Sequence, residues 1–395
     1  MVSNPQIYLD ISIAGEKIGR IVCELFAEKA PTTVKNFRSL CLEDHCIEED
    51  KVLTYRGNYF HRIIKNFVVQ CGDIIHCSGE FVKSDDAGKG GCSIFATREE
   101  IHNGNNSELQ CFGNFLDENL GDFNASFYLA MANMGTPDSN SSQFFITTAV
   151  SPHLNGKHSI FGRVTHGKSV VRSIEYSKVD SDGFPLECIK IDQCGDWDIL
   201  KGLPLFNASN DSIGGDTYEE YPDDNEDLDS EDFSAAYEAA NIIKESGTLL
   251  YKKKDYKNAY FKYNKSLRYV NEFIPDIEVD AENNRKFTHL KIKLYLNMSL
   301  VSLKMKRYDE AIKFSSFLLD MNEVPNIDQC KALYRRGEAF VAKKHYENAL
   351  QDYKSCQEIN PDDRAVMDKI LSLEKTLEDK KEKTKRNIAK FFSSS

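Results

Sequence analysis

Apolar and polar residues alternate along the first part of the chain. Apolar side chains occupy every second position in residues 7–13 and recur on one side of residues 18–25, and Ala14-Gly15 separates the two runs. A period of two is typical of a β-strand with one buried face, and a short break between two such runs is typical of a tight turn. The pattern therefore predicts an antiparallel hairpin near the N-terminus.

A helical pattern follows this hairpin. Pro31 opens a segment whose shared apolar face is made by Val34, Phe37, Leu40 and Cys41. Short apolar runs continue after it and are separated by glycine-containing connections. We expect an antiparallel β-barrel with one or two helices over its ends.

Beyond about residue 233 the apolar pattern becomes helical and repeats. Three tyrosines are each followed by an alanine three residues later and preceded by a small residue nine residues earlier. The tyrosines are Tyr256, Tyr308 and Tyr346, and the small residues are Gly247, Ser299 and Gly337. Small residues are needed where paired helices cross closely, so the repeat predicts an array of helix pairs. A final amphipathic helix is expected to cap the array through Val366, Ile370, Leu373 and Leu377.

An acidic segment lies between these two patterns. Eleven acidic residues and no basic residue occur from Asp211 to Asp232. Such a composition buries too little apolar surface to order itself, which predicts a solvated linker; the alternative is a functional mimic of an acidic tail. The expected division is a barrel domain over residues 1–198, an acidic linker over 199–232, three repeats over 233–362, and a capping helix with a basic tail over 363–395.

Composition narrows the possible functions. The net charge of −12 argues against nucleic-acid binding, and the sequence has neither a membrane-spanning apolar run nor a cleavable leader pattern. We therefore expect a cytoplasmic protein that also has access to the nucleus. Eleven cysteines without a CxxC pair indicate no disulfide framework, and the cluster Cys41–Cys46 lacks a second ligand pair for zinc. No metal or cofactor is expected.

The residues with the most distinctive chemistry lie between Tyr55 and Asp73. Arg62 and Gln70 are eight residues apart among closely spaced apolar positions. In an extended chain they point to one face together with Phe60, which gives an apolar slot with a guanidinium held by an amide. A purely structural Arg–Gln pair accounts for the spacing equally well.

These residues resemble the signature of the cyclophilins, the peptidyl-prolyl cis-trans isomerases. Phe60–Ile64 reads FHRII, and F-x-x-Q-x-G-D follows at Phe67–Asp73. Further matches follow in order at Leu129–Asn133, Ser142–Ile146, Leu154–His158 and Ile160–Gly162. The resemblance extends over about residues 6–197. It implies a cyclophilin barrel that isomerises prolyl bonds in proline-containing client polypeptides.

The chemistry that the resemblance implies needs no nucleophile. A prolyl bond isomerises slowly because amide resonance must be broken, with a barrier of roughly 20 kcal/mol. A catalyst needs a pocket for the proline ring and a donor that stabilises the twisted amide, and a guanidinium is such a donor. The resemblance assigns catalysis to Arg62, Gln70, Phe67, Val68, Phe145 and His158, with Gln70 orienting Arg62. It assigns substrate binding to Ala132, Asn133, Gln143, His153 and Leu154, with Asn133 acting mainly through its backbone.

The sequence departs from the usual cyclophilin pattern at four positions. Val68 stands where methionine is usual, Cys71 replaces a smaller residue, and Met134 stands where alanine is common. His153 occupies the position of a tryptophan that contacts cyclosporin, so we expect weak cyclosporin binding. The resemblance still favours an active enzyme of low rate. The alternative is an inactive adaptor whose barrel only binds clients.

The helical repeats resemble tetratricopeptide repeats. Five of their residues are similar to the carboxylate clamp of chaperone-binding members, namely Lys244, Thr248, Asn297, Lys331 and Arg335. Residues four apart share a helix face, so these side chains can converge on a concave surface. The resemblance implies a co-chaperone that docks on the acidic C-terminal tail of the 90-kDa heat-shock chaperone, and the 70-kDa chaperone is a second candidate. Thr248 stands where the clamp normally has asparagine, and lysines that only solubilise a helix surface are the alternative.

Overall fold

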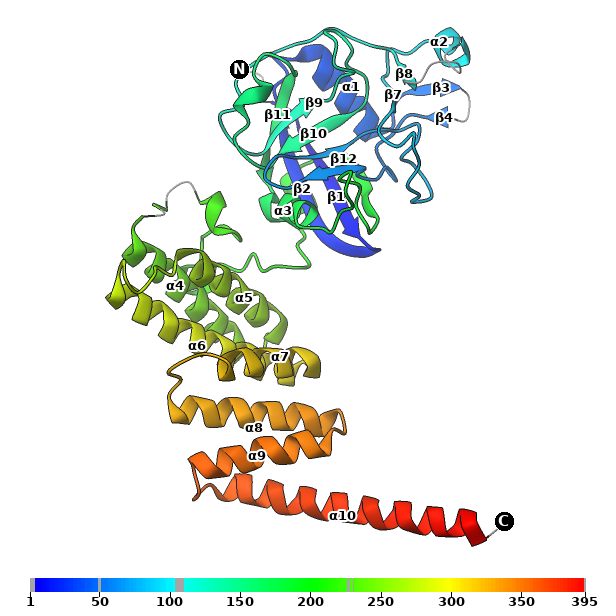
Figure 1. The fold of residues 1–395 in the computed structure, drawn as a ribbon. Coiled ribbons are helices and arrows are strands. Elements are labelled where there is room, and N and C mark those ends of the chain that lie inside the picture. Colours follow the sequence, from blue (N-terminus) through cyan, green and yellow to red (C-terminus); the bar gives the residue numbers. More distant parts are fainter. Residues whose placement is uncertain (1–3, 49–50, 104–109, 226–227, 230, 394–395) are drawn as a thin grey trace. The chain divides into compact units, whose positions relative to one another are not determined.

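The computed structural model describes residues 4–48, 51–103, 110–225, 228–229 and 231–393 (Figure 1). These residues form two compact units, Met1–Asn207 and Ala208–Ser395, and each is considered by itself. None of the helices in the described ranges combines the length and the apolar character needed to cross a membrane.

The N-terminal alternation forms the predicted hairpin. Strands β1 (Gln6–Ile13) and β2 (Glu16–Leu25) pair antiparallel. The turn between them uses Ala14 and Gly15, both with positive φ, which is the geometry of tight hairpin turns. The alternate apolar residues of both strands are buried, so this hairpin supplies one wall of the first core.

The first unit is built on a curled antiparallel sheet. Among the described residues, eight strands follow the order β12-β1-β2-β11-β9-β10-β6-β5. Besides β1 and β2 they are β5 (Arg62–Ile64), β6 (Val68–Cys71), β9 (Tyr128–Met131), β10 (Phe144–Thr147), β11 (Ile160–His166) and β12 (Ile189–Asp196). The chain just before β5 meets the other edge, because the Gly57 amide donates to Ile191 and the Phe60 amide donates to Ile189. The sheet therefore closes on itself as the predicted barrel.

Two helices cover the barrel. Helix α1 (Pro31–Leu42) begins at the predicted proline and buries Val34, Phe37 and Leu40 against the barrel core. Helix α3 (Lys168–Glu175) buries Val170, Val171 and Ile174. Short elements complete the unit: β3 (Cys46–Glu48), β4 (Lys51–Val52), β7 (Gly90–Cys92), α2 (Arg98–Asn103) and β8 (Gln110–Phe112).

A buried carboxylate anchors the long connection that follows β6. Asp73 accepts hydrogen bonds from the backbone amides of Ile75, His76, Gly88 and Gly90, at 2.8–3.1 Å. These bonds satisfy a charge that would otherwise be costly to bury. They fix the turn at residues 86–90 against the end of β6, where the candidate site lies.

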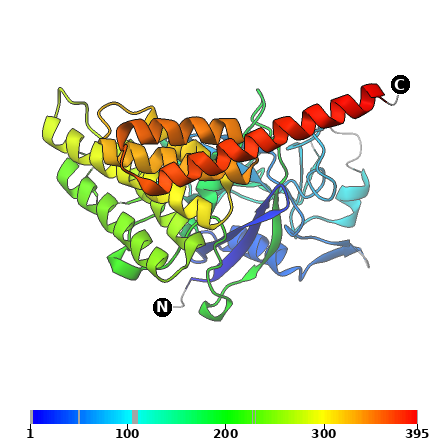
Figure 2. The same cartoon turned by 90° about the horizontal axis from the view of Figure 1, so that it is seen from below.

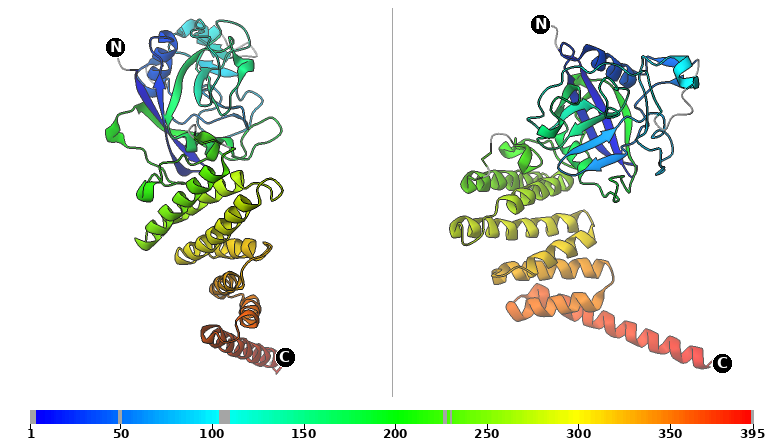
Figure 3. Two further views of the ribbon diagram at one scale, coloured as in Figure 1. Left: turned by 90° about the vertical axis from the view of Figure 1, so that its left-hand side faces the viewer. Right: turned by 45° about the horizontal axis from the view of Figure 1, so that its top comes forward.

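The second unit consists of stacked helices (Figure 2). In the described ranges the pairs are α4 (Phe233–Lys252) with α5 (Tyr256–Phe273), α6 (Ala281–Lys304) with α7 (Tyr308–Leu319), and α8 (Asn326–Ala342) with α9 (Tyr346–Ile359). Helix α10 (Arg364–Ser393) packs on α9 through its first half and continues beyond this pair (Figure 3).

The repeat signals have a direct structural meaning. Each repeated tyrosine is the first residue of the second helix of its pair. A β-carbon on Gly247 would lie 2.8 Å from the ring of Tyr263, and one on Gly337 would lie 2.7 Å from the ring of Tyr353. These distances are shorter than van der Waals contact, so the crossings of α4 with α5 and of α8 with α9 require glycine.

The sequence predicted a solvated linker over residues 199–232, and this prediction is wrong for residues 208–225. Asp216 is 4% exposed and accepts from the ammonium groups of Lys262 and Lys265 on α5, at 2.6 and 2.7 Å. Glu220 forms an ion pair with Arg268 on the same helix. Composition alone misled the prediction, because the order comes from basic residues some 45 positions further along the chain.

Candidate active site and peptide groove

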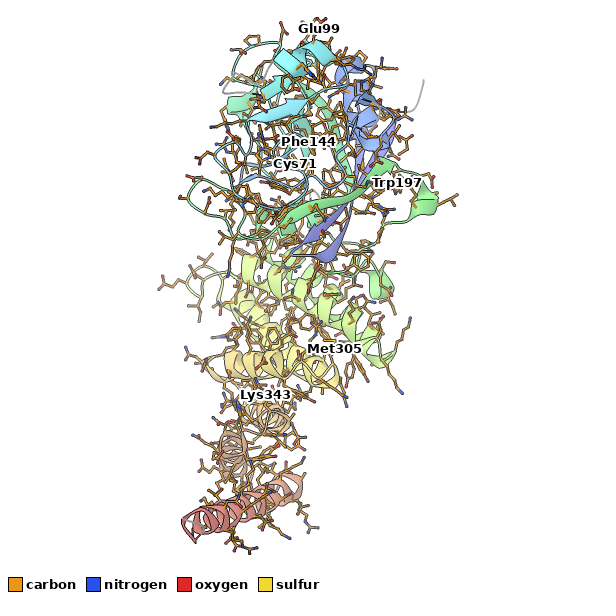
Figure 4. All side chains as sticks on the ribbon, turned by 90° about the vertical axis from the view of Figure 1, so that its right-hand side faces the viewer. Cys71, Glu99, Phe144, Trp197, Met305 and Lys343 are labelled. Atoms are coloured by element: carbon orange, nitrogen blue, oxygen red, sulfur yellow. The ribbon has the colours of Figure 1, made fainter. Side chains whose placement is uncertain are left out.

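A second apolar cluster lies apart from the barrel core. Val68, Phe145 and Leu154 are buried in it together with Phe123, Ala130 and Ile160, and Phe67 and Ala132 pack against it. Neighbouring residues on each strand take opposite sides, because side chains alternate along a strand. Phe144 and Cys71, paired across β10 and β6, enter the barrel core (Figure 4), whereas Phe145 enters the second cluster.

Arg62, Gln70 and Phe145 form one row across three strands. Arg62 pairs with Gln70 between β5 and β6, and Gln70 pairs with Phe145 between β6 and β10. Cross-strand partners point to the same face of a sheet. The row therefore places a guanidinium beside the apolar cluster that contains Val68, Phe145 and Leu154.

Two details of the predicted slot are wrong. The chain turns between Arg62 and Gln70, so they share a face as hairpin partners and not as positions of one extended strand. Phe60 does not share that face, because its ring is buried in the barrel core.

Gln70 does not hold Arg62 in this structure. The amide nitrogen of Gln70 donates to Oε1 of Gln143, at 2.8 Å. The side chain of Arg62 is exposed and makes no hydrogen bond or ion pair with any residue that the structure describes. The guanidinium has no acceptor among the described residues, which leaves all the donors of Arg62 open to a ligand.

Gln143 connects the site to the turn at residues 86–90. Its amide nitrogen donates to the carbonyl oxygens of Gly88 and Gly90, at 2.8 and 2.6 Å, and the residue is 7% exposed. Both of its N–H donors and its oxygen are therefore engaged. Gln143 fixes Gln70 and the edge of the site, and the long connection after β6 thereby contributes to site geometry.

Two histidines line the apolar cluster. The ring of His158 meets that of Phe145 edge-on, with centroids 5.3 Å apart. Its Nδ1 lies 3.0 Å from the carbonyl oxygen of Met131, which can only accept, so Nδ1 carries the proton. Burial lowers the pKa of His158 below its ordinary value, which keeps the ring neutral. The ring of His153 is exposed and packs on Phe67, at 4.8 Å.

The peptide edge of the site uses β9 and the residues after it. The Ala132 amide donates to the Gln143 carbonyl, at 3.0 Å. The side chain of Asn133 is engaged within the protein, because it donates to Lys157 and accepts from Gly135. These contacts leave the backbone carbonyl of Asn133 as its natural point of contact for a peptide.

One further residue of the site escaped the sequence prediction. His61 lies within the FHRII motif, directly before Arg62, and is buried beside Gly88. Burial lowers its pKa to about 4, so the ring is neutral at neutral pH. The sequence signal that could have identified His61 is its position among the apolar residues of this motif.

The five predicted clamp residues lie on the first helix of each pair. Lys244 and Thr248 are on α4, Asn297 is on α6, and Lys331 and Arg335 are on α8. Several of them already have partners. Lys244 contacts Glu245, Lys331 contacts Asp328 at 2.8 Å, and the hydroxyl of Thr248 donates to the Lys244 carbonyl.

Arg335 joins α8 to α6 next to Asn297. Its guanidinium donates to the Leu296 carbonyl, and burial lowers its pKa. A groove of about 740 Å³ between α6, α8 and α10 is lined by both Lys331 and Arg335. The structure therefore brings the two third-repeat residues together in this groove, whose lining does not include Lys244, Thr248 or Asn297.

An exposed guanidinium in one row with a buried apolar cluster on a curled antiparallel sheet is the arrangement expected of a cyclophilin. The family described as cyclophilin type peptidyl-prolyl cis-trans isomerase/CLD matches residues 8–196, and the chain belongs to this family. The tetratricopeptide repeat family matches residues 330–363, which cover most of α8 and all of α9. The protein is therefore a peptidyl-prolyl isomerase that also carries a tetratricopeptide repeat.

Two relatives match the chain over its whole length. It is 55% identical over 395 residues, 100% of both chains, to peptidyl-prolyl cis-trans isomerase CYP7 of Saccharomyces cerevisiae. It is 33% identical over 396 residues, 99% of both chains, to peptidyl-prolyl cis-trans isomerase D of Kluyveromyces lactis.

Proposed function

We propose that this isomerase is a co-chaperone, which twists prolyl bonds in client polypeptides while its helical unit holds the acidic C-terminal tail of a 90-kDa heat-shock chaperone. The observation that carries the docking proposal is the pair Lys331 and Arg335, both of which line the groove between α6, α8 and α10. The tail of the 70-kDa chaperone is a second ligand of the same chemistry.

The isomerase mechanism follows from the row of three residues. The proline ring enters the cluster of Phe67, Val68, Phe145 and Leu154, and Arg62 donates to the prolyl amide as it twists. The prolyl nitrogen becomes a better acceptor when resonance is lost, so the guanidinium binds the twisted state more tightly than the planar one. Arg62 needs no change of protonation, because a guanidinium stays charged.

The charges of the groove suit a tail carboxylate. The contact between Lys331 and Asp328 is exposed, and such a pair contributes little, so an incoming carboxylate can replace Asp328. Arg335 is largely buried, and a carboxylate partner is worth more to a buried charge than to an exposed one. The hydroxyl of Thr248 is occupied within α4, so we expect less help from the first repeat than an asparagine would give.

Direct titration tests the docking proposal. An acidic peptide with a free C-terminal carboxylate should bind the full chain, and Lys331→Glu should weaken binding at least about tenfold by placing a negative charge in the groove. Lys313→Glu on α7 is the matched control, because Lys313 is an exposed lysine on a second helix, outside the groove lining. Equal binding by both variants, or equal binding of the amidated peptide, would place recognition elsewhere.

One observation favours an alternative in which the barrel mainly holds clients. Gln70 engages Gln143 and leaves Arg62 without an orienting partner. An unoriented guanidinium loses part of its catalytic advantage, so this arrangement fits a slow enzyme with a retained binding pocket. The exposed ring of His153 offers less apolar area than tryptophan, and weak cyclosporin binding belongs to the same proposal.

A further inference from the structure

A buried ion pair lies behind the site and has no part in the mechanism above. Arg172 and Glu175 are one turn apart on α3, with Nη1 and Oε2 at 2.8 Å. Arg172 is 6% exposed and Glu175 is 2% exposed. The ring of Phe127 covers the guanidinium, 4.9 Å from the ring centre.

The pair holds two backbone groups that border the apolar pocket. Glu175 Oε1 accepts from the amide of Asn66, at 2.8 Å, in the turn between β5 and β6. Arg172 Nη1 donates to the carbonyl of Thr148, at 2.9 Å, directly after β10. The Thr148 amide in turn donates to the carbonyl of Phe67, at 2.8 Å, so the turn and the end of β10 are linked both directly and through α3.

Stability alone does not account for this arrangement. Taking both charges out of water costs several kcal/mol per ion, and replacing a buried pair by apolar residues of similar volume is often neutral or stabilising. What apolar residues cannot supply is two directed hydrogen bonds to fixed points of the backbone. The pair therefore contributes geometry.

The two points that it fixes determine the shape of the site. The turn separates Arg62 from Phe67, and its residue Asn66 has the left-handed φ of 56°. The second fixed point is Thr148, directly after β10. The residue before it, Thr147, is the cross-strand partner of Val68. A shift of the turn against β10 changes the distance between the guanidinium and the pocket wall.

We propose that Arg172 and Glu175 are positioning residues for prolyl isomerisation, which hold the β5–β6 turn and the end of β10 in the register that places Arg62 beside the pocket. They touch no substrate and act through the backbone of Asn66 and Thr148. Misplacement of a catalytic group by a fraction of an ångström to 1 Å is enough to lower a rate substantially.

The test separates geometry from stability in the full chain. Arg172→Met combined with Glu175→Leu should leave the melting temperature unchanged or raised and lower kcat/KM for a proline peptide about tenfold. Most of the loss should be in kcat, because the apolar surface that binds the ring is retained. The exposed pair Arg163 and Glu24 on the barrel wall is the matched control, and Arg163→Met with Glu24→Leu should leave kcat/KM unchanged.

A second variant covers the case in which the double variant does not fold. Arg172→Lys keeps a charge for Glu175 but shortens the side chain, so its donor falls short of the position of Nη1, which bonds both Glu175 and Thr148. We expect kcat to fall severalfold at an unchanged melting temperature. A folded double variant with the kcat/KM of the wild type would overturn the proposal. If the double variant is unfolded, a lysine variant with the kcat of the wild type would also overturn the proposal.

Discussion

Arg62 is the residue on which the proposed isomerase chemistry depends, and its surroundings are unusual for a catalytic group. It is exposed and has no partner among the described residues, while the amides of Gln70 and Gln143 bind each other. An unpartnered guanidinium is free to bind a twisted amide. It also loses side-chain entropy when it does so, which lowers the rate relative to an arginine that is already held.

The buried histidines predict how stability changes with pH. The pKa of His61 is lowered to about 4 in the folded protein, against an ordinary value near 6.5. Between these values the unfolded chain binds more protons, so folding stability should rise with pH from about 4 to 6.5 and level off above. At 1.36 kcal/mol per pKa unit, His61 accounts for about 3 kcal/mol, and His158 adds to it in the same direction.

Urea unfolding at a series of pH values measures this dependence. His61→Gln should reduce the slope between pH 4 and 6.5, because it removes the buried ring whose pKa is lowered. An identical slope in His61→Gln and the wild type would show that His61 is not the residue that titrates.

At the residue scale the sequence predicted the members of the site better than their contacts. The motif placed Phe67, Val68, Phe145 and Leu154 in one pocket, and all four meet there. It did not predict that Gln70 would donate to Gln143, because this contact depends on distances that are set by the fold. Phe60 was misplaced because it lies before β5, where the chain bonds to β12 and the alternation of β5 does not extend.

Among the elements, the helical repeats were predictable because their signals are local. Lys254, Lys306 and Lys344 each adopt a left-handed φ two residues before the repeated tyrosine, so the same turn recurs in every pair. Gly247 and Gly337 mark the helix crossings for a steric reason that the spacing alone reveals. Periodicity of this kind needs no knowledge of distant contacts.

The acidic segment shows where local signals fail. Its order depends on Asp216 meeting Lys262 and Lys265 on α5, which are distant in sequence. Its aromatic residue Tyr218 packs on the same helical core. The second unit therefore begins before α4, at Ala208.

Removal of one carboxylate tests this role of the segment. Asp216→Asn leaves two buried ammonium groups without their counter-charge, and breaking a buried ion pair in this way costs about 3–5 kcal/mol. Calorimetry of the full chain should show the transition of the helical unit lowered by roughly 10 °C. Asp223→Asn is the control, because Asp223 is an exposed acidic residue of the same segment. Equal transition temperatures for both variants would contradict this role and would identify the segment as a spacer.

For the whole molecule, the central point is that one chain combines an isomerase barrel with a helical unit that carries a tetratricopeptide repeat. Two relatives share this full length, so the combination is a property of the chain and not of a local match. The two units have separate cores. Catalysis should therefore depend on Arg62 and its pocket whether or not the groove beside Lys331 and Arg335 is filled.

Exchange NMR on a short proline peptide tests this account most directly, with the wild-type chain compared with Arg62→Ala. We predict that the wild type accelerates cis-trans exchange, and that the variant keeps the wild-type fold and melting temperature but loses at least about 99% of the acceleration, which corresponds to roughly 2.7 kcal/mol of lost transition-state binding. Equal acceleration by a folded Arg62→Ala chain would contradict the assignment of catalysis to the guanidinium.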